Sequence, residues 1–223
     1  MRKEFLLIPG PTPVPPQVSM AMATEMFNHR GPRFQALQDE LIRSLKNIFQ
    51  TEGRLFILTT SGTGIMETSV VNFISPGQKV LALSNGAFGE RMAAIAEAYG
   101  IEVERVDSGW GLPLDYQALD DKLKADRDGT ICAVMVVHNE SSTGMMNDLA
   151  LISKIRGEHP ALLIVDAVSS MGAVDIPVDR LGIDVCVTGS QKALMLPPGL
   201  AIISVSPRAW SVGVKSINYK YYF

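Results

Sequence analysis

Short apolar runs recur along the chain, and segments with helical spacing lie around them. From Phe34 onward, apolar residues recur at every third or fourth position, which predicts an amphipathic helix. A second helical pattern places Met92, Ala96 and Tyr99 on one face. The apolar runs cover residues 55–58, 80–83, 131–137, 162–165, 185–187 and 201–205.

The runs lack polar alternation, which is typical of strands covered on both faces. Such strands predict an α/β fold in which a mostly parallel sheet lies between two helical layers. Residues 9–16 contain five prolines and predict an extended arm that is neither helix nor central strand. We therefore expect an arm over residues 1–16 and one large domain over residues 17–223.

Composition and charge exclude several classes of partner. Hydrophobic residues make up 47% of the chain and the net charge is −3, with no basic block, so we expect no nucleic-acid partner. Residues 5–8 are too short for a signal-peptide core, and no run approaches a membrane span, which predicts a cytoplasmic protein. Cys132 and Cys186 lie inside apolar runs without metal-ligand spacing, so we expect free thiols and no metal site.

Two candidate groups follow strand runs, at the sheet edge where ligands of such folds bind. Residues 59–64 (TTSGTG) precede a helix expected from about Ile65, and their small side chains let backbone N–H groups bind a phosphate. An ordinary strand-to-helix turn is the alternative. Asp166 ends the run 162–165, where a buried carboxylate needs a partner such as a pyridinium N–H, unless it only caps the next turn.

The third candidate is Lys192, which follows the run 185–187 and precedes the apolar residues 193–199. Most lysines are solvated, but burial here lowers the pKa of the amine and makes it a better nucleophile toward a carbonyl. A phosphate-binding turn, an acid and a lysine at successive strand ends are what pyridoxal 5′-phosphate (PLP) requires of a protein.

Four ordered segments resemble the class V aminotransferases of PLP fold type I, most closely the alanine–glyoxylate and serine–pyruvate group. They are residues 61–63 (SGT), 138–144 (HNESSTG), 165–170 (VDAVSS) and 189–193 (GSQKA), within a resemblance that runs from Pro9 to the end of the chain. It implies a three-layer αβα large domain and a homodimer. It also implies transfer of an amino group from alanine or serine to a 2-oxo acid such as glyoxylate or pyruvate.

The resemblance implies a role for each site residue. Lys192 is expected to be catalytic, forming the Schiff base and carrying protons. Asp166 is expected to pair with the ring nitrogen, and Gly10 to lie close to the substrate. The other implied cofactor contacts are Ser61, Gly62, Thr63 and Gln191 at the phosphate, Phe88 and Val168 on opposite ring faces, and Ser141 near the 3-hydroxyl group.

Some residues leave alternatives open. Family members often carry tryptophan where this chain has Phe88, which keeps the stacking with less area. A lyase or desulfurase is the alternative within the cofactor class, although desulfurases need a mobile cysteine and a histidine where Gln191 stands. We expect His138 to position its loop rather than to act as a base, and Arg208 to be solvated.

The chain ends at Phe223, short of the C-terminal small domain that the resemblance implies. That domain carries the arginine that binds the substrate carboxylate, and no arginine of this sequence can be assigned that role. A PLP-binding fragment with little turnover is therefore a second alternative. We expect a chain that ends there to transfer amino groups slowly, because a bidentate clamp supplies both orientation and binding energy.

Overall fold

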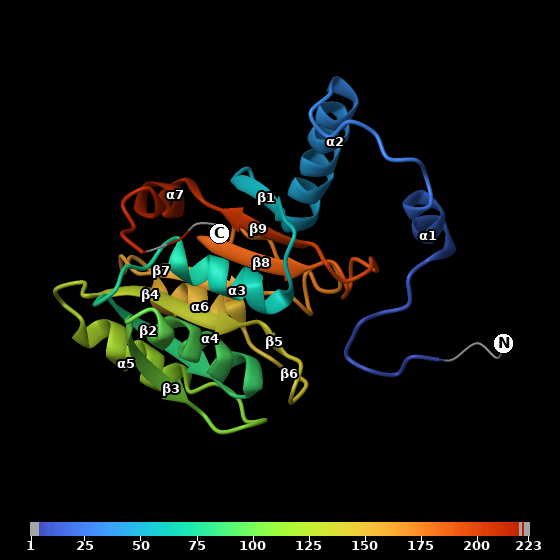
Figure 1. The fold of residues 1–223 in the computed structure, drawn as a ribbon. Helices are drawn as coiled ribbons and strands as arrows, with labels where there is room; N and C mark the ends of the chain where they lie inside the picture. The colour runs from blue at the N-terminus through green and yellow to red at the C-terminus, as the bar shows by residue number, and fades with distance from the viewer. Residues whose placement is uncertain (1–4, 219, 221–223) are drawn as a thin grey trace.

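A seven-stranded sheet forms the centre of the computed structural model, which describes residues 5–218 and 220 (Figure 1). The strand order is β1-β9-β8-β7-β4-β2-β3. The strands are β1 Arg54–Leu58, β2 Lys79–Ser84, β3 Glu102–Asp107, β4 Ile131–Val137, β7 Leu162–Asp166, β8 Val185–Gly189 and β9 Ala201–Val205, and the short pair β5 Asn139–Glu140 and β6 Met145–Met146 lies apart from them.

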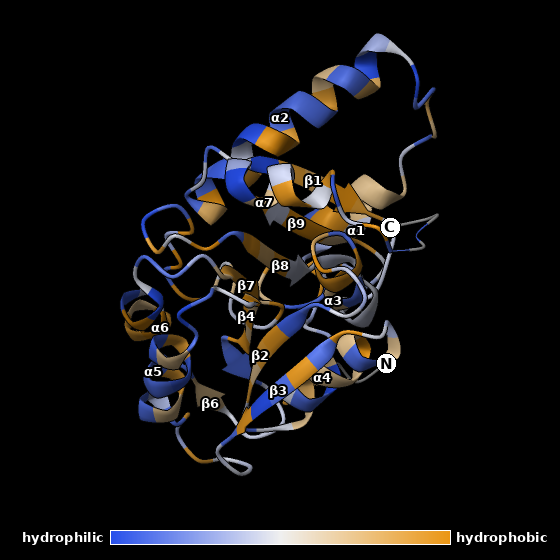
Figure 2. Ribbon diagram, turned by 90° about the vertical axis from the view of Figure 1, so that its left-hand side faces the viewer, coloured by the Kyte–Doolittle hydropathy of each residue, from blue (hydrophilic) through white to orange (hydrophobic). Residues whose placement is uncertain are grey.

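The predicted, mostly parallel sheet is confirmed. Neighbouring strands from β3 to β8 pair in parallel, whereas β9 pairs antiparallel with both β8 and β1. Each of the six apolar runs forms one strand. Strand β3 was not predicted, because charged residues flank and separate Val103 and Val106. The segment therefore contains no continuous apolar run. Figure 2 shows polar and apolar colours alternating along β3, as expected at the sheet edge, where one side of the strand meets solvent.

Helices cover both faces of the sheet. Three of them, over residues 32–49, 62–71 and 87–98, lie where the sequence predicts helices. The helix predicted from about Ile65 begins earlier, at Gly62, because the Ser61 hydroxyl caps it by accepting a 3.1 Å hydrogen bond from Gly64 N. None of the described helices is long and apolar enough to cross a membrane. The helices are α1 Pro16–Met22, α2 Pro32–Phe49, α3 Gly62–Val71, α4 Ala87–Ala98, α5 Tyr116–Ala125, α6 Leu149–Arg156 and α7 Pro207–Gly213.

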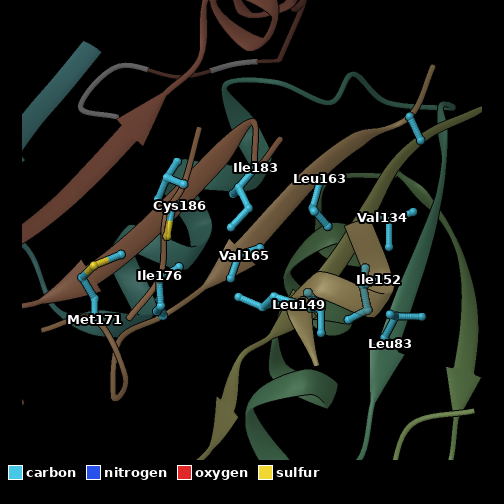
Figure 3. Close-up of a cluster of buried hydrophobic side chains, with 14 of the residues drawn as sticks. Leu83, Val134, Leu149, Ile152, Leu163, Val165, Met171, Ile176, Ile183 and Cys186 are labelled. Atoms are coloured by element: carbon cyan, nitrogen blue, oxygen red, sulfur yellow. The ribbon is translucent and has the colours of Figure 1, made fainter. Parts of the chain in front are cut away.

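The hydrophobic core consists of two clusters, one on each face of the sheet. Alternate strand residues point to opposite faces, so Val80 packs with α3 and α4 whereas Leu81 packs with α5 and α6. Figure 3 shows the cluster on the side of α5 and α6, which includes Cys186 of β8 and Met171. Both cysteines are free thiols, as predicted; burial raises the pKa of Cys132 to about 11 and that of Cys186 further still.

The N-terminal arm and the two helices after it make few contacts with the sheet (Figure 1). The extended stretch ends at Pro15 rather than at residue 16, because Pro16 is the first residue of α1, where a missing N–H is tolerated. No residue of α1 is buried. Pro9 and Thr12 of the arm form hydrogen bonds with residues 191 and 192 of the same chain.

Helix α2 matches the predicted apolar periodicity, but most of its apolar face is exposed. Only Leu45 and Phe49, in its last two turns, are buried. Four of its other apolar residues are 37–42% exposed, which leaves a stripe on one side of the helix, whereas Ile42 packs partly buried against the core. We call this stripe the α2 face; it consists of Phe34, Leu37, Leu41 and Ile48.

Arg208 is exposed, as predicted, with 40% of its side chain accessible, but it also forms an ion pair. Ser206 caps α7, whose first turn places the guanidinium against Asp184, which is 4% exposed. Arg208 Nε donates to Asp184 Oδ1 at 2.9 Å, and Nη2 donates to Oδ2. A buried carboxylate requires a counter-ion, so tertiary packing rather than the local sequence sets the environment of this arginine.

Candidate active site

The carboxyl ends of β4, β7 and β8 meet at one edge of the sheet beside the start of α3, and a pocket of about 270 Å³ opens there. All nine residues predicted to contact the cofactor line this pocket. A second pocket, of about 360 Å³, lies between Phe56 and Trp210 and is mostly apolar, so it offers less chemistry. Five lining residues of the first pocket were not predicted: Met66, Arg91, Val137, Asn139 and Ser169.

The start of α3 has the features of an anion-binding site. The backbone N–H groups of its first turn have no partner within the helix, and the helix dipole is positive at this end. Ser61 Oγ accepts from Gly64 N, so its O–H remains able to donate. Gly62 faces the pocket, where a Cβ would lie 3.5 Å from Val168 Cγ1 and 3.9 Å from Gln191 Nε2. These features are typical of a phosphate site.

Asp166, the last residue of β7, is 3% exposed. Burial raises the pKa of its carboxyl group from 3.8 to about 6, against the opposing effect of a 2.7 Å hydrogen bond from Val168 N to Oδ1. Within the described part of the chain, no recorded hydrogen bond reaches the other carboxylate oxygen. A protonated ring nitrogen would supply the missing donor.

Lys192 lies half-buried in the same pocket. Burial lowers the pKa of its amine, and the charge of Asp166 offsets part of that effect. Nζ donates a 2.9 Å hydrogen bond to the carbonyl oxygen of Pro9. Gly10 packs directly on this side chain: its φ is +145°, and a Cβ there would lie 2.8 Å from Nζ. The structure thus brings Gly10 to Lys192, with no room for a larger residue.

Glu140 is a buried carboxylate that sequence reasoning did not single out. It is 0% exposed, and its Oε2 accepts hydrogen bonds of 3.0 Å from the backbone N–H groups of Phe88 and Gly89. Its Oε1 accepts from Ser142 N at 3.1 Å and from Ser142 Oγ at 2.6 Å. Glu140 therefore joins the first turn of α4, which carries Phe88, to the loop that carries Ser141.

Replacing Glu140 with alanine should lower the free energy of unfolding by about 3 kcal/mol, because several buried donors lose their acceptor at once. Urea unfolding followed by circular dichroism measures this change. Glu52, whose side chain is 94% exposed, is the matched control, and its alanine variant should change stability by less than about 1 kcal/mol. Equal effects of the two substitutions would show that Glu140 does not hold the two segments together.

His138 follows β4 and holds its loop in place, in agreement with the prediction. Its backbone N donates to Asp166 O at 2.8 Å, its O accepts from Asn147 N at 2.8 Å, and its Nδ1 lies 2.9 Å from Ser170 Oγ. Burial lowers the pKa of the ring, which favours the neutral form. His138 is not among the lining residues of the pocket.

Arg91 is the charged lining residue that sequence reasoning missed. It lies three residues after Phe88 on α4, a spacing that places both side chains on one side of a helix, and this spacing was the available signal. Its Nη1 donates to Thr63 Oγ1 at 3.1 Å, and its Cζ lies 4.9 Å from the centre of the Phe88 ring.

The groups around this pocket fit PLP. The start of α3 can hold the phosphate, the second oxygen of Asp166 can accept from a ring nitrogen, and the amine of Lys192 can condense with an aldehyde. Phe88 and Val168 provide apolar surface for a flat ring. No group of three or more potential metal-ligating side chains occurs among the described residues.

Comparisons with known proteins point in the same direction. The family model described as Aminotransferase class-V matches residues 5–213. A soluble hydrogenase 42 kDa subunit of Anabaena cylindrica is 46% identical over 99% of this chain and 58% of its own length. A serine–glyoxylate aminotransferase of Arabidopsis thaliana is 38% identical over 99% of this chain and 56% of its own length.

The solved structures agree with these relatives. An alanine–glyoxylate aminotransferase from Nostoc sp. superposes with a TM-score of 0.91 at 32% identity, covering 97% of this chain and 57% of that one. The chain thus spans little more than half the length of the proteins it matches. The family match covers most of the chain, and its fold is that of the PLP-dependent aminotransferases of fold type I. The chain belongs to the class-V aminotransferase family.

Proposed function

We propose that this chain binds PLP and supports transfer of an amino group from alanine or serine to a 2-oxo acid such as glyoxylate or pyruvate. The observation that carries the proposal is the meeting of Lys192, Asp166 and the start of α3 around one pocket. The aminotransferase names among the relatives support the substrate class. The hydrogenase name of another relative has no counterpart in the chemistry of this pocket.

The geometry of the pocket supports the following binding roles. Ser61, Gly62, Thr63 and Gln191 hold the phosphate at the start of α3. Phe88 and Val168 would hold the ring between apolar side chains, and Ser141 would contact its 3-hydroxyl group. Asp166 accepts a hydrogen bond from the ring nitrogen, and its negative charge keeps that nitrogen protonated. PLP supplies an aldehyde that condenses with amines and a ring that withdraws electrons from the substrate α-carbon.

Lys192 performs the proton transfers. Partial burial lowers the pKa of its amine, so more of it is neutral and nucleophilic at a given pH. With a substrate bound in the pocket, Nζ would act as the base that takes the proton from the substrate α-carbon. The same Nζ would then act as the acid that returns the proton. The Pro9 carbonyl and Gly10 confine the side chain on the arm side, where the substrate approaches.

Desulfuration is less consistent with the structure than amino transfer is. A desulfurase needs a reactive thiolate in a mobile segment, and a thiolate forms readily only where the pKa is low. Cys132 and Cys186 lie in β4 and β8, and burial raises the pKa of both thiols. A PLP-binding fragment with little turnover is the other alternative.

The domain organisation, partners and location are part of the same proposal. We assign residues 1–16 to an arm and residues 17–223 to the large domain of a cytoplasmic protein. A second copy of the chain would cover the exposed α2 face, since contiguous apolar surface of this kind marks interaction sites. The homodimer is testable by the mass of the purified protein in solution.

A single-turnover experiment tests the function. The purified protein is loaded with PLP and mixed with alanine or serine without an acceptor. We expect the visible absorption band to disappear as a stoichiometric amount of 2-oxo acid is released, and glyoxylate to restore the band. A band that neither amino acid changes would favour the binding fragment, and sulfide release from added cysteine would favour the desulfurase.

A further inference from the structure

Arg91 contacts both parts of the cofactor site. One nitrogen of its guanidinium donates to Thr63 at the start of α3, and its carbon atom lies over the ring of Phe88. A guanidinium within about 6 Å of an aromatic ring is attracted to the ring face, so Phe88 helps to hold Arg91 at the pocket. The two contacts place a fixed positive charge beside the anion site.

The hydrogen bond between Arg91 and Thr63 determines how the hydroxyl group can act. Arginine only donates hydrogen bonds, so Thr63 Oγ1 is the acceptor, and its own proton remains available to another acceptor. The hydroxyl of Ser61 is in the same state, because it accepts from Gly64 N. Both hydroxyl groups at the start of α3 are therefore prepared to donate to an anion.

Salt-bridge pairing distinguishes Arg91 from the nearby Arg105. No salt bridge among the described residues joins Arg91 to a carboxylate, whereas Arg105 of the neighbouring strand β3 pairs with Glu90 and Glu97 of α4. The charged lining residues in the described part of the pocket are Arg91, Asp166 and Lys192. Because Lys192 reacts with the aldehyde and Asp166 faces the ring nitrogen, Arg91 is the cation left for the phosphate.

We propose that Arg91 binds the phosphate group of the cofactor, directly and through the hydroxyl of Thr63. This inference rests on the proposed function, since it requires PLP in the pocket. A phosphate dianion at a helix N-terminus gains from charge-assisted hydrogen bonds, and a guanidinium supplies several donors in one plane. The loss of Arg91 should therefore weaken binding of PLP but not binding of pyridoxal, which has the same ring and aldehyde without the phosphate.

The test compares dissociation constants for PLP and pyridoxal, each measured from the Lys192-dependent absorption band. Arg91→Met should raise the dissociation constant for PLP by about 10- to 100-fold, as expected for a hydrogen bond to a charged group. The dissociation constant for pyridoxal should change by less than about twofold, because pyridoxal has no phosphate group to lose this hydrogen bond. Arg91→Lys keeps the charge without the planar donors and should fall between Arg91→Met and the wild type.

Arg105→Met is the matched control, because it removes the same charge from a residue that pairs with α4 outside the pocket. It should leave both constants unchanged. Equal weakening of PLP and pyridoxal by Arg91→Met would show that Arg91 acts through Phe88 and would overturn the phosphate assignment, as would no weakening of either. A wild-type protein that forms no absorption band with PLP would overturn the proposed function itself. If the band forms and Arg91→Met leaves its dependence on PLP concentration unchanged, only the assignment of Arg91 is overturned.

Discussion

Replacing Lys192 with alanine is expected to abolish the absorption band that the protein forms with PLP and to slow amino transfer by about 10³-fold or more. The amine of Lys192 is the group in the pocket that can condense with the aldehyde, and it is also the proton carrier. Both functions are lost in one substitution, so the effect should be larger than that of any other single change in the pocket.

The variant offers a second check on this assignment. Small free amines such as methylamine should restore part of the proton transfer in Lys192→Ala, because the cavity left by the side chain is open to the pocket. Lys154, exposed near the end of α6, is the matched control, and Lys154→Ala should retain the band and the rate. A band that persists in Lys192→Ala would show that another lysine reacts with the cofactor.

Asp166→Asn should reduce the rate of amino transfer by about 10²- to 10³-fold, an effect of the size seen for lost electrostatic stabilisation. The amide keeps the shape of the side chain but carries no charge, so it does not hold the ring nitrogen in its protonated form. The rate of band loss on addition of alanine measures the effect. Asp175→Asn, at an exposed position, should retain the wild-type rate; an equally fast Asp166→Asn variant would remove Asp166 from the mechanism.

The same substitution should have the opposite effect on the stability of the ligand-free protein. Burial raises the pKa of Asp166 from 3.8 to about 6, so over this interval the folded state holds the proton more tightly than the unfolded state does. The contribution of Asp166 to wild-type stability should therefore fall as the pH rises from about 4 to about 6 and stay lower above that range, whereas asparagine does not titrate.

Urea unfolding of both ligand-free proteins at acid and neutral pH tests this sign. Between pH 4 and pH 7.5, the stability of Asp166→Asn relative to wild type should increase by about 2 to 3 kcal/mol, which is the free-energy equivalent of the shift in pKa. The comparison is between two pH values, so any pH-independent free-energy cost of burying the amide cancels. A relative stability that does not change with pH would mean that the carboxyl group is not destabilised in the folded protein.

The positions of Asp166 and Lys192 could be predicted from the sequence because each follows an uninterrupted apolar run. Parallel strands place their carboxyl ends at one edge, so residues that follow such runs meet there whatever their separation along the chain. The TTSGTG segment could be recognised for a similar reason, since small residues before a helix mark its N-terminus. The resemblance to class V aminotransferases added the remaining cofactor contacts, all of which line the same pocket, and Gly10, which packs on Lys192.

The polar contacts around the site could not be predicted in this way. Glu140 caps the helix that carries Phe88, although more than fifty residues separate them, and Arg208 pairs with Asp184 from a segment that looked like an exposed turn. Such partners are chosen by direction and distance in the folded chain, and local sequence contains neither. The same limit applied to β3, whose charged residues are tolerated only because it lies at the sheet edge.

The sequence alone thus determined the layered fold and the strand ends where chemistry is possible, because burial on both faces requires continuous apolar runs and parallel strands share one edge. Only the tertiary structure decided which charges meet at that edge. It placed Arg91 beside Thr63 and packed Gly10 on Lys192, since a hydrogen bond or a close contact depends on atoms that distant segments bring together.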